Sequence, residues 1–185
     1  MKTFVKVLVA ILIVIGLCFG VYAVLPQTSK MFVKGNIQYR TDDTAKAQVD
    51  KIKKTKIPGF DKTFGDGLEN LCKSSAWYYE EEASGDWKVT YYGSKATMDL
   101  TTAGMDQMYT DQPMKVEFTV RNNSQVDIVI TIKDDILSTD QAKEAAYEKI
   151  ANAAIMLIKY AAKRIRKPSR NFTANSCSLL TGRQL

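Results

Sequence analysis

Residues 114–132, MKVEFTVRNNSQVDIVITI, decide the fold of this chain. Apolar and polar residues alternate from position 114 to 120 and again from 126 to 132. A period of two residues is typical of a half-buried β-strand. The polar residues 122–125, NNSQ, join the two runs as a turn. We therefore predict an antiparallel hairpin with one face in a core.

A second predicted hairpin lies upstream and is rich in aromatic residues. Residues 77–82 and 87–93 flank the short loop 83–86, ASGD. Alternation places Trp77 with Tyr79, and Trp87 with Tyr91, on shared faces, whereas Tyr78 and Tyr92 point away from them. One set is expected in the core, and the other could form an aromatic platform for a protein, glycan or peptide. The candidate partner-binding residues are Tyr78, Tyr79, Tyr91 and Tyr92.

Helical patterns surround these strands. Thr44 is expected to cap a short helix that runs to Lys54. Thr63 and Asp66 resemble a capping box for a second helix, whose early glycines make it dependent on packing against a sheet. A long helix is expected at residues 139–167, with Ser138 and Gln141 as its capping pair. Residues 101–113 are expected to form a long connection.

These elements predict an α+β fold. It consists of an N-terminal transmembrane helix and a four-stranded antiparallel sheet made of two hairpins. A short helix precedes the sheet, and the long C-terminal helix packs on one face. The predicted organisation is a membrane segment at 1–25, a linker at 26–43, a domain at 44–167 and a tail at 168–185.

The N-terminal segment predicts where the domain works. Residues 7–25 form a run of 19 residues without a charge, long enough for a helix to cross a bilayer. Lys2 and Lys6 precede it, and such a positive flank stays inside. We expect a single-pass protein of the bacterial inner (plasma) membrane with its domain on the periplasmic or extracellular side. Alternatively, the small-residue spacing of residues 21–23 favours cleavage after Ala23 and release as a periplasmic or secreted protein.

Composition narrows the chemistry. The chain has no histidine, which excludes Ser-His-Asp and Cys-His catalysis and every histidine-containing metal site. We therefore expect no enzyme, no metal and no cofactor. The net charge of +6 is modest, and we expect no nucleic-acid binding.

Two further sets of residues are candidate sites. Cys72 and Cys177 could form a disulfide in an exported protein, or Cys72 could be buried and Cys177 free. A basic cluster near the C-terminus could complement the helix dipole or contact anionic phospholipid. Its members are Lys159, Lys163, Arg164, Arg166, Lys167 and Arg170.

Part of the chain resembles a family of small bacterial exported or membrane-anchored domains of uncharacterised function. The resemblance rests on residues 60–70, FDKTFGDGLEN, on Trp77, on 87–93, WKVTYYG, and on 116–120, VEFTV. It covers under half of the chain, and its motifs are those of a fold. The acidic residues 80–82 and the long final helix depart from the family pattern. The resemblance implies an exported α+β domain and carries no active site.

The combined expectation is a membrane-tethered, non-enzymatic binding or accessory protein of the bacterial cell envelope that acts through protein contacts. The alternative is a cleaved, exported inhibitor or immunity-type protein that sequesters an enzyme or toxin.

Overall fold

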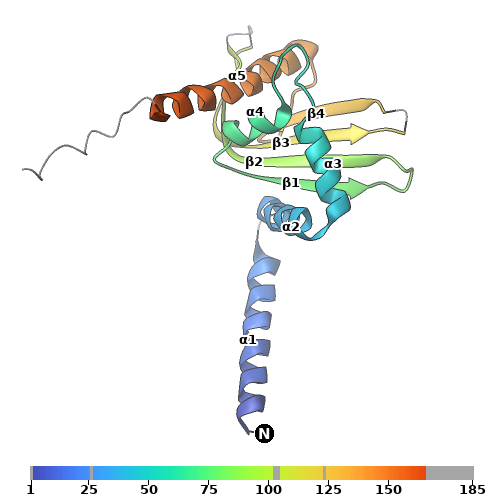
Figure 1. Ribbon diagram of the computed structural model, residues 1–185, viewed down its shortest axis with the longest axis vertical. Coiled ribbons are helices and arrows are strands. Elements are labelled where there is room, and N and C mark those ends of the chain that lie inside the picture. Colours follow the sequence, from blue (N-terminus) through green and yellow to red (C-terminus); the bar gives the residue numbers. More distant parts are fainter. Residues whose placement is uncertain (1, 26, 102–104, 123, 166–185) are drawn as a thin grey trace, which may run out of the picture.

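An antiparallel sheet forms the centre of the domain (Figure 1). The computed structural model describes residues 2–25, 27–101, 105–122 and 124–165. The strands are β1 (Ser74–Glu81), β2 (Trp87–Asp99), β3 (Met108–Val120), β4 (Val126–Ile132) and β5 (Asp135–Ile136), and they pair in chain order. Both predicted hairpins are confirmed. The sheet has five strands rather than four, because β5 adds a short fifth one, and β2 pairs with β3 to join the hairpins into one meander.

The β2–β3 hairpin is longer than the sequence pattern predicted. Much of the stretch 101–113, expected to be a connection, belongs to β3. The pairing shifts register between Gly93 and Met98, and Lys95 and Asp111 have left-handed φ values of 55° and 53°. Such bulges bend a hairpin and move side chains to the other face. The alternation that identifies a strand is therefore interrupted here.

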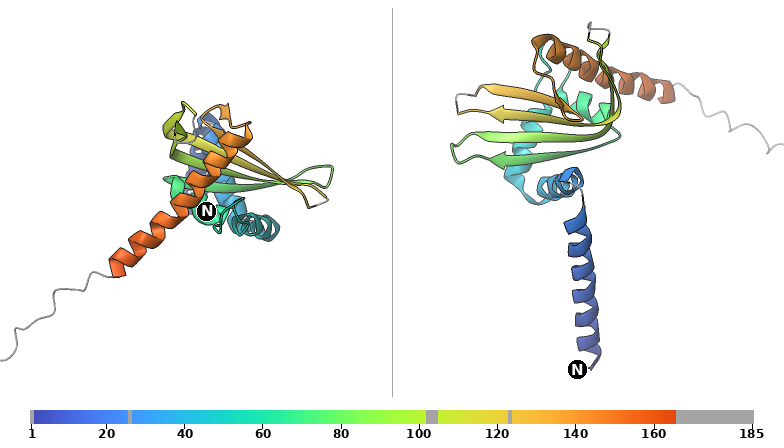
Figure 2. Two further views of the ribbon diagram at one scale, coloured as in Figure 1. Left: turned by 90° about the horizontal axis from the view of Figure 1, so that it is seen from above. Right: turned by 180° about the vertical axis from the view of Figure 1, so that it is seen from behind.

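Three helices lie on one side of the sheet: α3 (Asp43–Lys53), α4 (Phe64–Leu71) and α5 (Asp140–Ile165). On the opposite face, α2 (Gln27–Thr41) packs along β1, and Figure 2 shows the rest of that face without a covering helix. The core between the two layers includes Trp77, Val89, Tyr91, Val116, Phe118, Ile130 and Ile132 from the strands, and Val49, Ile52, Phe64, Leu68, Ala146 and Ile150 from the helices. The α+β class is therefore confirmed.

The helix caps agree only partly with the predictions. Thr63 caps α4 as predicted, because its Oγ1 accepts a hydrogen bond of 3.2 Å from the Asp66 amide. Asp42, and not Thr44, caps α3 through its carboxylate and the Ala45 amide. Thr139, and not Ser138, caps α5, since its Oγ1 accepts from the Ala142 amide at 3.2 Å. In both corrections another side-chain oxygen, one or two positions from the predicted residue, accepts a free amide of the first helical turn.

The glycines of α4 serve close packing. A Cβ on Gly67 would lie 2.5 Å from the Ile150 carbonyl oxygen of α5, and one on Gly65 would lie 2.9 Å from the Lys53 carbonyl oxygen at the end of α3. The helix therefore depends on packing, as predicted, but these two contacts are with other helices rather than with the sheet.

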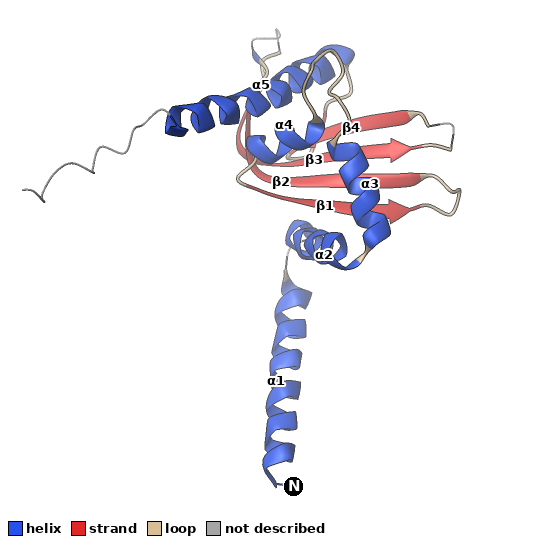
Figure 3. Ribbon diagram, in the orientation of Figure 1, coloured by secondary structure: helices blue, strands red, loops and turns tan. Residues whose placement is uncertain are grey.

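Two further helices precede the domain (Figure 3). α1 (Lys2–Val24) contains the one segment of the described chain that is long and apolar enough to cross a membrane, Phe4–Val24, with a mean hydropathy of 2.9 and none of it buried. A retained anchor and a signal sequence are both compatible with it. Residues 26–43, expected to be a linker, instead contain α2 (Gln27–Thr41), which packs on β1.

Candidate functional site

Two of the predicted partner-binding tyrosines belong to the core. Tyr91 is fully buried, and its hydroxyl donates a hydrogen bond of 2.6 Å to the Leu68 carbonyl oxygen. Burial raises the pKa of Tyr91. Tyr79 is 9% exposed and packs near Trp87 at a centroid distance of 6.2 Å. Neither ring offers a surface to a partner, because each fills space between the sheet and the helices.

The other two tyrosines point to the opposite face, as the alternation predicted. Tyr78 is nevertheless only 9% exposed, because α2 packs on β1, with the Lys34 ammonium 4.4 Å from the Tyr78 ring centroid. Tyr92 is half-buried, and burial, followed by the nearby carboxylates of Glu117 and Glu80, raises its pKa. The predicted aromatic platform is therefore reduced to one partly exposed ring.

The uncovered face around Tyr92 is polar and internally paired. Lys115 contacts Glu117 at 2.8 Å, and Lys88 contacts Glu80 at 3.5 Å. Exposed pairs of this kind contribute little to stability, and their charges are already matched. This arrangement is typical of a solvated sheet face.

The thiol of Cys72 is shielded rather than reactive. Cys72 is 7% exposed and free, and burial raises its pKa, so the thiol stays protonated at neutral pH. A Cβ on Gly93 would collide with its sulfur, so the absence of a side chain at Gly93 makes room for the thiol. Cys177, the predicted disulfide partner, lies outside the described residues.

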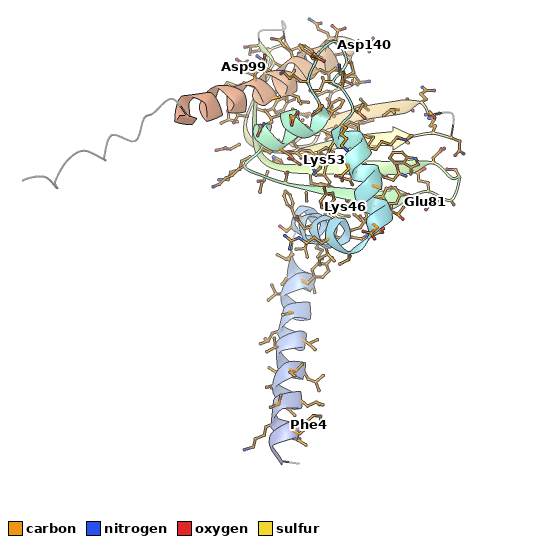
Figure 4. The ribbon with its side chains drawn as sticks, in the orientation of Figure 1. Phe4, Lys46, Lys53, Glu81, Asp99 and Asp140 are labelled. Carbon is orange, nitrogen blue, oxygen red and sulfur yellow. The ribbon has the colours of Figure 1, made fainter. Side chains whose placement is uncertain are left out.

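The basic cluster at the end of α5 is only partly described. The helix backbone continues through Lys159, Lys163 and Arg164 to Ile165, whereas Arg166, Lys167 and Arg170 lie outside the described residues. Figure 4 shows Asp140, at the start of α5, at the end of the domain opposite Phe4 and α1. The element next to α1 is α2.

One edge of the sheet is closed by α2. The Gln38 side chain donates from Nε2 to the Tyr79 carbonyl oxygen and accepts the Tyr79 amide on Oε1, both at 2.9 Å. A single amide side chain thus satisfies both outward backbone groups of one residue of β1. Gly35 permits this close approach of the helix because it has no side chain. A Cβ at this position would lie 2.6 Å from the Trp77 carbonyl oxygen. Covering an edge in this way prevents pairing with another chain.

The opposite edge, on β4, is open over its first half. The Leu137 amide donates to the Ile130 carbonyl oxygen, which shows that residues 126, 128 and 130 direct their backbone groups outward. β5 pairs only with Thr131 and Ile132. Within the described part of the chain, the outward groups of Val126 and Ile128 have no partner.

Exposed apolar side chains accompany this open edge. Val126 and Val129 are each 38% exposed, and Ile136 of β5 is 62% exposed. Ile136 pairs with Thr131, so it shares the uncovered face with Val129, whereas Val126 lies on the other side of the strand. We call these three residues and Ile128 the β4 edge surface. Sequence analysis missed it, although Val129, an apolar residue at an outward position, was a signal.

The described part of the domain also has grooves away from the β4 edge surface. A groove of about 730 Å³ lies between residues 58–60 and the start of α5, and its lining includes the acidic residues Asp140, Glu144 and Glu148. No group of three or more metal-binding side chains occurs among the residues that the structure describes.

The chain matches no protein-family model, no curated protein and no solved structure. The resemblance to exported bacterial domains therefore stays a prediction.

Proposed function

We propose that this protein is a membrane-tethered binding protein of the bacterial cell envelope, which captures an extended segment of a partner protein as an added strand along β4. The observation that carries the proposal is the unpaired, apolar first half of β4, in a sheet whose other edge is covered. α1 supplies the tether, because its apolar segment is long enough to cross a bilayer.

The edge offers the two components of strand addition. Main-chain groups provide affinity, and side-chain pockets on alternate positions provide specificity. Here Val126 and Ile128 present their backbone groups outward, while Val129 and Ile136 provide an apolar surface on the uncovered face. Asp127, the nearest charge on β4, is already paired with Arg121 at 2.7 Å. A partner strand with alternating apolar residues would match this surface.

The proposal is tested by photocrosslinking in native membranes. A photoreactive amino acid at Ile136 of the full-length chain should give one defined crosslinked protein, and the same group at Lys46 on α3 should give none. Val126→Lys should abolish the product, because a charge at this position opposes an incoming strand. Met108→Lys is the matched control, since Met108 is also an exposed apolar strand residue, at 64%, but lies away from β4.

The backbone contribution is tested separately. Ile128→Pro removes an outward amide without removing a hydrogen bond to β3, so the fold should persist while the crosslink is lost. Ile128→Val keeps the amide and should keep the crosslink. Equal crosslinking by all variants would contradict strand addition, and a product of twice the chain mass would identify a second copy of this chain in place of a different partner.

A further inference from the structure

A second surface of the domain faces the outer end of α1. Figures 1 and 3 show α2 lying across this end, roughly perpendicular to α1. Positions 30, 33, 34, 37 and 41 lie on one face of α2 by helical spacing. On this face Val33 is 40% and Ile37 is 57% exposed, and Lys30 and Lys34 lie beside them. An exposed face that combines apolar and cationic residues is typical of helices at a membrane surface.

The face lines a groove between α1 and the domain. The groove has a volume of about 640 Å³, and its lining includes Cys18 and Tyr22 of α1, Val33, Lys34 and Ile37 of α2, and Tyr78 of β1. Most of the lining is apolar. It therefore extends the apolar surface of α1 onto the domain.

The charges on this face are positive and remain available. Lys30 Nζ donates to the Ala23 carbonyl oxygen at 3.0 Å, and Lys34 lies over the Tyr78 ring. Neither lysine forms an ion pair with a carboxylate among the described residues. Among the described residues that line the groove, Asp42 is the one acidic residue. The ammonium groups can therefore bind an additional anion.

The length of α1 determines where this face lies. The apolar segment Phe4–Val24 has 21 residues, which span about 30 Å, the thickness of the hydrocarbon core of a bilayer. Val24 then lies at the outer boundary of the hydrocarbon, and α2, which starts at Gln27, begins in the headgroup layer. The groove reaches from this layer down to Cys18, among the acyl chains.

We propose that this face of α2 and the groove bind an anionic phospholipid of the bilayer that α1 crosses. The acyl chain would lie along Cys18, Val33 and Ile37, and the headgroup phosphate would contact Lys30 and Lys34. The inference rests on the membrane tether of the proposed function. Lipid binding at this site would hold the α2-covered edge of the sheet against the membrane and direct the β4 edge surface away from the membrane.

The test uses the full-length chain in lipid vesicles. An environment-sensitive fluorophore is attached at Ile37→Cys in a chain carrying Cys18→Ser, Cys72→Ala and Cys177→Ser. Vesicles contain phosphatidylcholine alone or mixed with phosphatidylglycerol, with nitroxide-labelled lipid as quencher. The label at position 37 should be quenched, more strongly with phosphatidylglycerol, and Lys30→Glu with Lys34→Glu should remove that difference. Lys46→Glu, the matched control on α3, should leave it unchanged.

Labels at two other positions separate the tether from the lipid site. A label at Ile13→Cys reports insertion of α1, and one at Lys46→Cys should not be quenched. Quenching at 13 without quenching at 37 would overturn the lipid site and leave the tether intact. No quenching at either position would overturn both. Quenching at 37 that does not depend on phosphatidylglycerol would overturn the role of the anionic headgroup.

Discussion

The two edges of the sheet are treated differently. At β1 the backbone groups of Tyr79 are satisfied by Gln38, and α2 packs so closely that position 35 has no room for a side chain. At β4 the groups of Val126 and Ile128 face outward beside exposed valines. Natural proteins usually protect edge strands against pairing with other chains. The sheet therefore protects one edge and leaves the other open, and the proposed strand addition rests on this difference.

Of the substitutions that test the difference between the two edges, Gly35→Val is expected to change stability the most. A side chain here collides with the Trp77 carbonyl oxygen, so α2 must move away from β1. We expect a loss of about 3 kcal/mol in the free energy of unfolding, measured by urea denaturation of the full-length chain in detergent. Asn36→Ala, at the exposed neighbouring position, is the control and should change it by less than about 0.5 kcal/mol. Equal stabilities of the two variants would contradict the close packing of α2.

A smaller effect is expected when only the hydrogen bonds to the covered edge are removed. Gln38→Ala leaves the amide and carbonyl of Tyr79 without partners, at a cost of about 2 kcal/mol. Gln38→Glu keeps an acceptor for the amide and should fall between the wild type and alanine. Amide hydrogen exchange gives the readout: the Tyr79 amide should be protected in the wild type and exchange faster in the alanine variant. The Ile128 amide should exchange rapidly in all three, and its protection in the isolated chain would contradict an open β4 edge.

The smallest effect is expected at Tyr39, which joins α2 to α3. Its hydroxyl donates to the Asp50 carboxylate at 2.7 Å, and this hydrogen bond is the main reason why its pKa rises from the ordinary 10.0 to about 12. Tyr39→Phe should lose about 1 kcal/mol at neutral pH. Because the folded chain holds the proton more tightly, this contribution is complete below pH 10 and lost as the pH rises through 12. Urea denaturation at several pH values should show the stabilities of the wild type and Tyr39→Phe converging as the pH rises. A constant difference between them would exclude ionisation of Tyr39 as the source of the pH dependence.

The sheet was predictable where side chains alternate and unpredictable where the backbone departs from the regular strand. Residues 114–120 and 126–132 follow the period of two, and both are strands. Beyond Gly93, bulges with Lys95 and Asp111 in the left-handed region break that period. A glycine at these positions would indicate a bulge, but lysine and aspartate do not, so the sequence predicts a connection where the structure has an extended hairpin.

The site was harder to predict because it depends on which element covers which edge. Residues 26–43 were expected to be a linker, but Gly35 lies within α2 and permits its contact with β1. Without that helix, Tyr78 was expected to be exposed, and Lys34 in fact covers it. The edge of β4 is open because β5 has only two residues, Asp135–Ile136. A strand this short leaves no alternating pattern in the sequence, so its end could not be predicted.

The chain-order pairing of the strands has a consequence for how the protein is made. Each strand pairs with the one synthesised just before it, so most of the sheet is built from contacts that are close in sequence, which favours rapid folding. During synthesis α2 emerges before the sheet, and β1 therefore finds its covering helix already present. β4 emerges last among the long strands, and α5 completes the core only when Ile150 reaches Gly67. Until then the growing sheet always ends in its newest strand, while its first edge is already protected against misassembly.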